Sequence, residues 1–290
     1  KVARTVLWRV SGVKSSAFRR GTLSCACCYR VGRQRGSSSE ESRLKRRSLL
    51  KAAVLGSGAA LAAPAISKGL MEWRMVTSWP RGLPRLGTGA ERLAANITAM
   101  SGGRLTVKVY SAGELVPALE CLGAVANGTA QMGHDAAYYH AGKSEGCAFF
   151  TAFPFGFTMG EMAAWIKHGN GQKLWDELYA PFGIRGFQAG STGTQMFGWF
   201  RREIRSLADL DGLKFRTPGN QGRVLQKLGV TPVSLPGGEI FPALQSGAID
   251  GAEWVGPYND LALGFYQVCR YYYSPGYHEP GPNLQLTINE

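Results

Sequence analysis

Residues 212–258, GLKFRTPGNQGRVLQKLGVTPVSLPGGEIFPALQSGAIDGAEWVGPY, are the stretch on which our interpretation of the fold rests. The pattern predicts a strand ending at Arg216, then a helix, a strand, a second helix and a strand ending at Glu253 and Trp254. Strands that alternate with helices are typical of α/β proteins with a parallel sheet. Ligands bind at the carboxyl ends of such strands, so Arg216, Glu253 and Trp254 are candidate binding residues.

An earlier stretch has the same plan. Residues 107–119, VKVYSAGELVPAL, are similar to residues 233–244, VSLPGGEIFPAL. Each predicts a strand, then Gly-Glu, then a helix with proline in its first turn, where the missing N–H is tolerated. We interpret the two as related half-units that face each other across a cleft, the first delivering Tyr138 and Tyr139. Chance similarity is the alternative, because strand–helix–strand units reuse glycine, proline and alanine widely.

The remaining folded part alternates between expected strands and helices. Strands are predicted over residues 72–79, 105–110, 131–136, 147–153, 184–188, 194–200 and 284–288. Helices are predicted over residues 86–100, 115–126, 161–180 and 261–268. We therefore expect an α/β fold with a first domain over 70–192 and a second over 193–290 that includes return strands. No helix follows the last strand to cover the sheet, so we expect the C-terminal part of the fold to be missing.

The positive charge is concentrated at the N-terminus. Of 33 lysines and arginines, 15 lie in residues 1–69 beside only two glutamates, so residues 70–290 hold 18 basic and 18 acidic residues. A nucleic-acid-binding protein needs its basic surface on the folded part. The distribution argues against nucleic acid as a partner.

Residues 1–69 have the pattern of a leader that is absent from the mature protein. Lys45-Arg46-Arg47 precedes an apolar, small-residue run over 52–66, which is too short for an ordinary membrane span. The paired arginines resemble a twin-arginine export signal, although Lys45 and Leu49 depart from the usual residues. An ordinary secretory signal or an N-terminal anchor is the alternative. We expect a periplasmic protein, and no defined structure over residues 1–40.

Six cysteines do not form a recognisable framework. Cys25, Cys27 and Cys28 lack the spacing of a zinc site. The odd number that remains in the folded part argues against disulfides in an exported domain. We expect Cys121, Cys147 and Cys269 to be small core residues.

The candidate cleft residues suit a carboxylate and a hard cation. Arg216 offers a planar fork that binds a carboxylate through two hydrogen bonds. Gln195 and Glu253 offer side-chain oxygens, Trp254 its carbonyl, and Gln285 a further amide; oxygen ligands favour Na⁺ or Ca²⁺ over zinc. Each has a plainer interpretation, because Arg216 could form a structural ion pair and Glu253 could be a solvated acid.

Nine motifs spread over residues 70–290 match one family. They are Gly113–Pro117, Asn127-Gly128, Gly142-Lys143, Thr192–Gln195, Gly198–Arg201, Asp211–Arg216, Pro242–Leu244, Ile249-Asp250 and Ala252–Tyr258, the last being the most specific. On these motifs the chain resembles the periplasmic solute-binding proteins of TRAP transporters, in the branch that binds 2-oxo acids. The resemblance implies two α/β domains of the type II-like solute-binding fold around a hinged cleft.

The resemblance also implies roles for single residues. The position of Arg216 holds the substrate carboxylate, the positions of Gln195, Glu253 and Trp254 surround substrate and a bridging metal, commonly Na⁺, and the positions of Tyr138 and Tyr139 line the pocket. It further implies delivery of a small carboxylate such as pyruvate to integral-membrane transporter subunits. C-terminal helices that join two protomers in this branch are not found in the sequence, so a homodimer is an open expectation.

Two other function classes compete with transport. A ligand-presenting sensor protein would use the same cleft. An enzyme acting on small acids would need a base, for which His134, His140, His168 and His278 are available, but no catalytic motif accompanies them. We therefore expect a binding protein rather than an enzyme.

Overall fold

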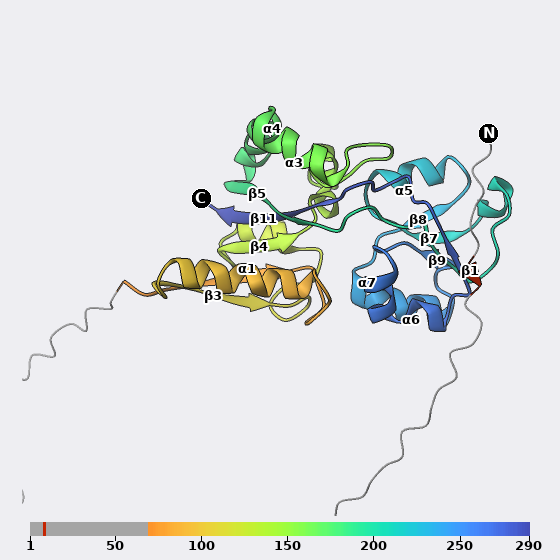
Figure 1. Ribbon diagram of the computed structural model, residues 1–290, viewed down its shortest axis with the longest axis horizontal. Coiled ribbons are helices and arrows are strands. Elements are labelled where there is room, and N and C mark those ends of the chain that lie inside the picture. The colour runs from red at the N-terminus through yellow and green to blue at the C-terminus, as the bar shows by residue number, and fades with distance from the viewer. Residues whose placement is uncertain (1–7, 10–68) are drawn as a thin grey trace, which may run out of the picture. The chain divides into compact units, whose positions relative to one another are not determined.

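The computed structural model describes residues 8–9 and 69–290, which form two β-sheets with helices packed against them (Figure 1). The five-stranded sheet has the order β3-β2-β4-β11-β5, and the six-stranded sheet the order β1-β10-β6-β9-β7-β8. We call the two halves the first lobe and the second lobe. The expected export signal lies outside the described residues. Within the described residues no helix is long and apolar enough to cross a membrane.

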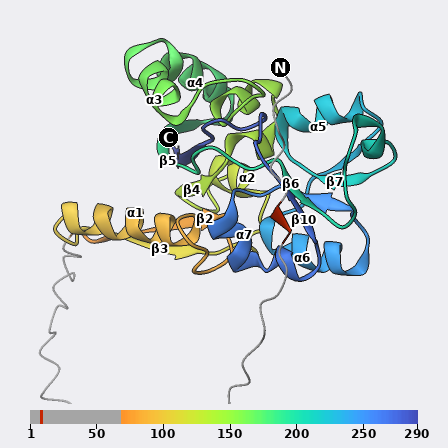
Figure 2. The ribbon, with the colours of Figure 1, turned by 45° about the vertical axis from the view of Figure 1, so that its right-hand side comes forward.

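The first lobe contains β2 (Met71–Thr77), α1 (Gly87–Met100), β3 (Leu105–Tyr110), α2 (Cys121–Ala126), β4 (Met132–Asp135), η1 (Ala137–His140), η2 (Glu145–Phe150), α3 (Met159–His168), α4 (Gly171–Tyr179), η3 (Ala180–Phe182), β5 (Ile184–Ser191) and β11 (Asn283–Asn289). Neighbouring residues of β2 point to opposite faces. Met75 packs into the core beneath α1, while Val76 packs into the core with α2, α3 and α4. The sheet is therefore covered on both sides, as Figure 2 shows for α1 and α2.

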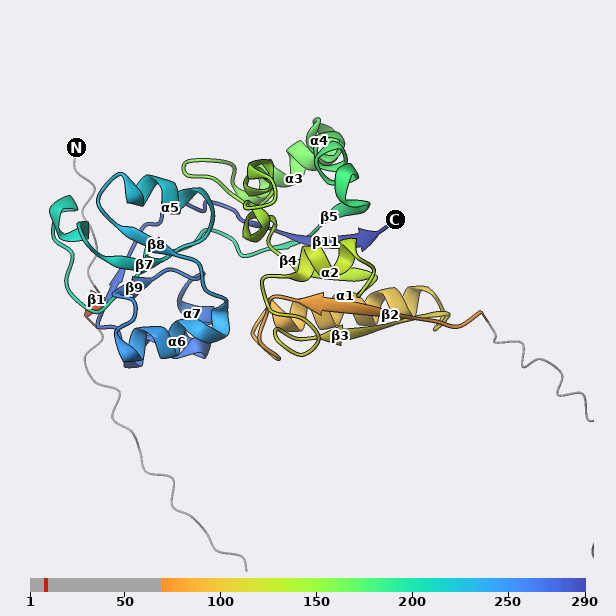
Figure 3. The ribbon, with the colours of Figure 1, turned by 180° about the vertical axis from the view of Figure 1, so that it is seen from behind.

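The second lobe contains β6 (Gly198–Phe200), η4 (Leu207–Leu210), β7 (Lys214–Arg216), α5 (Gly219–Gln226), β8 (Thr231–Val233), α6 (Gly237–Ser246), β9 (Gly251–Ala252), α7 (Pro257–Leu263), η5 (Phe265–Gln267) and β10 (Tyr271–Tyr273), with β1 (Trp8–Arg9) at its edge. Viewed from behind, α6 and α7 lie together beside β9 (Figure 3). Pro232 lies in β8, an edge strand, where a missing N–H does no harm. Strand β1 pairs with Tyr271 and Tyr272, although we expected no defined structure over residues 1–40.

The same topology occurs in both lobes. Strand β2 pairs in parallel with β3 and β4, and β7 pairs in parallel with β8 and β9. In each unit the first strand is central and two helical crossovers lead to its flanking strands. The expected half-units are thus present, but the prediction about proline was wrong. Pro242 lies inside α6, which begins at Gly237, and Pro117 precedes α2, which begins at Cys121.

Several local predictions also differ from the structure. The apolar run over 147–153 was expected to be a strand, but its first part lies in the 3-10 helix η2. Cys147 and Phe150 of this helix pack into the core of the first lobe, and the run does not pair with a sheet. The helix expected over 161–180 is two helices, separated at Gly169-Asn170. Strand β11 pairs with β4 and β5, so the last strand belongs to the first lobe.

The chain crosses between the lobes after β5 and again before β11. Residues 192–197 connect β5 to β6, and residues 274–282 connect β10 to β11. The two crossings are bonded to each other: Thr192 N donates to the carbonyl of Pro282, and Gln195 N to that of Glu279. These paired crossings carry side chains into the space between the lobes.

Candidate binding cleft

Arg216 is fully buried at the carboxyl end of β7. Its Nε donates to the Leu235 carbonyl at 3.0 Å, and its Nη1 donates to Glu253 at both the carbonyl, 3.0 Å, and Oε1, 2.7 Å. Its guanidinium carbon lies 5.0 Å from the ring centroid of Trp254. The remaining nitrogen, Nη2, is buried without a hydrogen-bond partner among the described residues. This arm of the guanidinium, near the Tyr139 hydroxyl, is therefore available to a ligand.

Glu253 reaches Arg216 because of the sheet register. Ala252 of β9 lies opposite Arg216, and Glu253 N donates to the Arg216 carbonyl at 3.2 Å. Glu253 Oε1 forms the ion pair with Arg216, whereas Oε2 has no hydrogen-bond partner in the described part. Trp254 follows, and its ring lies against Gly237, where an added Cβ would approach within 2.7 Å. The start of α6 therefore fixes the aromatic wall beside the ion pair.

Tyr138 and Tyr139 come from the first lobe, on the 3-10 turn η1 that directly follows β4. Their rings meet edge to face, with centroids 4.9 Å apart, and Tyr138 N donates to Thr151 Oγ1. Burial raises the pKa of Tyr139 to about 12, so its hydroxyl stays protonated and can donate to a bound anion. The turn thus presents two hydroxyl-bearing rings toward the second lobe.

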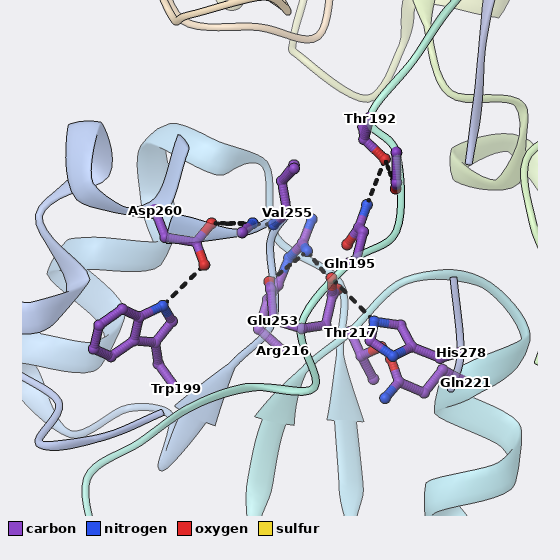
Figure 4. Close-up of polar contacts among 12 residues, drawn as sticks. Thr192, Gln195, Trp199, Arg216, Thr217, Gln221, Glu253, Val255, Asp260 and His278 are labelled. Atoms are coloured by element: carbon purple, nitrogen blue, oxygen red, sulfur yellow. Dashed lines mark hydrogen bonds and ion pairs between the residues drawn. The ribbon is translucent and has the colours of Figure 1, made fainter. Parts of the chain in front are cut away.

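Gln195 and Glu279 lie on the two crossings. Gln195 is buried, and its Nε2 donates to Thr192 Oγ1 at 3.2 Å, which directs Oε1 away from that bond. Gln195 Oε1 and Glu279 Oε2 are both buried without hydrogen-bond partners among residues the structure describes. Figure 4 shows Gln195 near Arg216, Glu253 and His278. Residues from both crossings therefore add unpaired oxygens to the cleft.

Glu279 and His278 are the residues that sequence reasoning missed as part of the site. Ligand atoms of Glu253, His278 and Glu279 all lie within 4.8 Å of one another, and all three side chains are buried. His278 Nε2 lies 3.8 Å from Glu253 Oε2. The available signal was the pair of titratable residues in the turn-rich segment HEPGP, residues 278–282, of which we considered only His278, as a possible base.

Gln285 was predicted to join the metal ligands, and the structure places it in another network. Its Nε2 donates to Asp135 Oδ1 at 2.6 Å, and its Oε1 accepts from the Tyr179 hydroxyl at 2.7 Å. Asp135 Oδ2 in turn lies 2.6 Å from His140 Nε2. Both ends of the Gln285 amide are thus engaged inside the first lobe, so we leave it out of the cation-binding set. The sequence could not separate these sites, because β11 was not assigned to the first lobe.

The charges of the cleft favour a bound cation next to a bound anion. Burial raises the pKa of Glu279 well above its ordinary value, the neighbouring Glu253 raises it further, and Arg216 lowers it. Burial alone would lower the pKa of Arg216, but Glu253 and the tyrosines outweigh this, and the guanidinium stays charged. Two acids and one amide oxygen form a hard donor set that suits Na⁺ or Ca²⁺. The three unpaired buried oxygens fit such a cation, because buried polar atoms ordinarily have partners.

Three cysteines and two histidines of the described residues belong to the packing. Cys121, Cys147 and Cys269 are free and buried, as expected. His134 Nδ1 accepts a hydrogen bond from Trp79 Nε1 at 2.8 Å. Together with the Asp135 pairing of His140, this gives two of the four histidines structural partners.

Comparison with known proteins identifies the family. The family model of bacterial extracellular solute-binding proteins, family 7, matches residues 75–290. This chain belongs to that family. A monocarboxylate 2-oxoacid-binding periplasmic protein of Nostoc sp. is 48% identical over 219 residues, which are 76% of this chain and 60% of the relative.

Solved structures of TRAP transporter solute-binding proteins are similar to this member of the family. One from Pseudoalteromonas atlantica, with bound sodium and pyruvate, is 42% identical with a TM-score of 0.73, over 76% of this chain and 67% of that one. One from Bordetella bronchiseptica, a dimer with calcium and picolinate bound, is 41% identical with a TM-score of 0.74, over 76% and 66%. The chain spans about 60% of the length of the curated relative. These likenesses confirm the resemblance to TRAP solute-binding proteins and the two-domain α/β fold.

Proposed function

We propose that this protein is the substrate-binding component of a TRAP-type transporter and captures a small 2-oxo acid, such as pyruvate, together with Na⁺ or Ca²⁺. One observation carries the proposal: a buried guanidinium nitrogen and three buried oxygens, all without partners in the described part of the chain, occur in one cleft. The nitrogen complements a carboxylate and the oxygens complement a cation. The similar proteins with bound pyruvate and sodium, or with bound calcium and picolinate, support both ligands.

Each cleft residue has a role in this proposal. Arg216 holds the substrate carboxylate, and its pair with Glu253 fixes the direction of the free Nη2. Gln195, Glu253, Glu279 and the carbonyl of Trp254 hold the cation, which supplies positive charge for the carboxylate and keto oxygens of the substrate. Tyr138 and Tyr139 close the cleft from the first lobe. Cation ligands on both crossings would couple ligand capture to the relative position of the lobes.

The proposal extends to location and partners. A periplasmic protein exported through Arg46-Arg47 and cleaved between Ala65 and Gly69 would deliver its substrate to integral-membrane subunits. N-terminal sequencing of the exported product tests the location, because a mature protein that retains Lys51 excludes this cleavage. A homodimer is supported by the dimeric Bordetella protein and is tested by light scattering.

Calorimetric titration with a panel of 2-oxo acids, hydroxy acids and dicarboxylates, with and without Na⁺ or Ca²⁺, tests the function. We expect saturable binding of 2-oxo acids that strengthens with the cation. Preference for a dicarboxylate, or binding indifferent to both cations, would contradict the proposal.

A further inference from the structure

Trp79 lies beside the proposed cleft residues Tyr139, Gln195 and Trp254. It lies just after β2 and is almost completely buried. Its ring contacts both lobes: the centroid is 6.2 Å from that of Tyr139 in the first lobe and 6.3 Å from that of Trp254 in the second, edge to face. A side chain in this position moves relative to Trp254 whenever the lobes move.

His134 holds the Trp79 ring in one orientation. The indole Nε1 donates to His134 Nδ1 at 2.8 Å, and His134 lies on β4 next to β2, with Thr77 opposite it in the register. Burial lowers the pKa of His134, which favours the neutral ring, and because the indole N–H can only donate, Nδ1 is the acceptor nitrogen of that ring. This buried hydrogen bond between a strand residue and the segment that follows the adjacent strand fixes both rings, so Trp79 is a rigid wall.

Trp79 forms the apolar end of a small cavity beside the proposed site. The cavity has a volume of about 10 Å³, room for roughly one water-sized group. Its lining includes Gln195 and Trp254, whose ring lies under the Arg216 guanidinium, and the apolar side chains of Trp79, Leu86 and Leu284. A substrate bound between Arg216 and the cleft residues Tyr139, Gln195 and Trp254 would therefore have little space toward this apolar wall.

We propose that Trp79, oriented by His134, limits the length of the substrate carbon chain and makes this protein selective for the shortest 2-oxo acids. The inference rests on the proposed function, because it takes a 2-oxo acid as the ligand. Each methylene beyond pyruvate would have to displace a hydrogen-bonded, close-packed indole. One extra or missing methylene changes the affinity of a ligand for an apolar pocket by about 10–200-fold. An effect of this size is enough to discriminate between 2-oxo acids of different chain length.

Calorimetry with unbranched 2-oxo acids of three to six carbons tests this in wild type, Trp79→Leu and the matched control Trp73→Leu. Trp73 lies within β2, packs on the side of α1 and does not line the cavity. We expect Trp79→Leu to reduce the preference for the three-carbon over the six-carbon acid by at least about tenfold. Trp73→Leu should keep the wild-type profile, and thermal melts establish that each variant is folded.

Two further variants test the orienting role of His134. His134→Leu removes the acceptor and should shift the chain-length profile in the same direction as Trp79→Leu, while His134→Gln, whose amide oxygen can accept, should shift it less. An unchanged profile in a folded Trp79→Leu would overturn the length limit alone and would direct longer chains to the opening lined by Tyr138, Thr217 and Gly219. Failure of the wild type to bind any 2-oxo acid would overturn the proposed function as well.

Discussion

Two buried polar clusters, one in the first lobe and one between the lobes, have similar residues but different hydrogen bonding. In the first, Asp135, His140, Tyr179 and Gln285 bond to one another, and both Asp135 oxygens and the Gln285 oxygen have partners. In the second, Gln195, Arg216, Glu253 and Glu279 each keep one buried atom without a partner in the described residues.

This difference indicates that the first cluster contributes to stability and the second to ligand binding. A buried network whose polar atoms all have hydrogen-bond partners stabilises one conformation. Replacing one of its residues leaves the partner atoms buried without hydrogen bonds, which lowers the free energy of unfolding. Unpaired atoms at a native site need another explanation, such as an ion or ligand that completes them. We therefore expect substitutions in the first cluster to lower stability and substitutions in the second to lower binding.

The largest effect is expected for Arg216→Lys. Lysine keeps a positive charge opposite Glu253 but cannot copy the second, free arm of the guanidinium. Pyruvate binding should weaken by roughly 2–5 kcal/mol, the scale for truncating a buried charge pair. Calorimetry beside thermal melts checks this. Near-normal affinity with a much lower melting temperature would show that Arg216 is purely a structural residue.

The matched pair Gln285→Leu and Gln195→Leu makes the same chemical change in both clusters. Gln285→Leu removes the partner of Asp135 Oδ1 and the acceptor of the Tyr179 hydroxyl, and should cost at least about 2 kcal/mol of unfolding free energy, since each unpaired buried group costs about 1–3 kcal/mol. Its cation affinity should be unchanged.

Gln195→Leu should show the opposite pattern, losing Ca²⁺ and Na⁺ affinity with a smaller loss of stability. Urea unfolding measures stability, and titration with Ca²⁺ alone measures cation binding. Loss of cation binding in Gln285→Leu with stability retained would restore Gln285 to the metal ligands and refute the division.

Glu279→Gln should lower cation affinity without lowering stability. Glutamine does not ionise, so the variant avoids the cost of an acid that is buried beside Glu253, and the cation-free variant should be as stable as wild type or more stable. Its Ca²⁺ affinity should fall at least about tenfold, or about 1.4 kcal/mol. Differential scanning calorimetry with and without Ca²⁺ measures both. A destabilised variant that still binds Ca²⁺ would assign Glu279 to the packing.

The smallest effect concerns Asp260, a satisfied acid in the second lobe. It accepts from Val255 N, Gly256 N, Trp199 Nε1 and the Tyr272 hydroxyl, which ties down the segment after Trp254. Burial nevertheless raises the pKa of Asp260 to about 6. A raised pKa favours the protonated acid, so this contribution is present below the unfolded pKa of about 3.9 and is lost as pH rises through 6.

Comparison with Asp260→Asn isolates that contribution, because the amide does not titrate. The melting temperature of wild type minus that of the variant should fall between pH 5 and pH 7 in cation-free buffer. A difference that stays constant or grows over this range would show that Asp260 is ionised throughout.

The sequence predicted the strand ends that carry the proposed binding residues of the second lobe better than the arrangement around them. Arg216 and Glu253 follow predicted strands, and strand ends are fixed by local pattern. Glu279 enters the cleft only because β10 and β11 lie in different sheets, which makes the segment between them a crossing. Gln285 was grouped with the proposed metal ligands for the same reason. Strand pairing depends on contacts between residues far apart in the sequence, and hydrophobic periodicity does not reveal such contacts.

Two predictions about local structure were wrong for a related reason. The apolar run at 147–153 satisfies strand and buried-turn patterns equally well, and only packing against Trp165 and Trp175 decides between them. Pro242 lies inside α6 rather than in its first turn, because α6 already begins at Gly237. The repeat, by contrast, was predictable, because each half-unit carries its own alternation of strand and helix.

The most direct test of the account is the thermodynamic coupling between cation and substrate in the wild-type protein. The dissociation constant of Ca²⁺ is measured with and without saturating pyruvate, and that of pyruvate with and without saturating Ca²⁺. If both complete one cleft, each should tighten the other by the same factor, at least about tenfold. Two affinities that do not respond to each other would contradict a shared site.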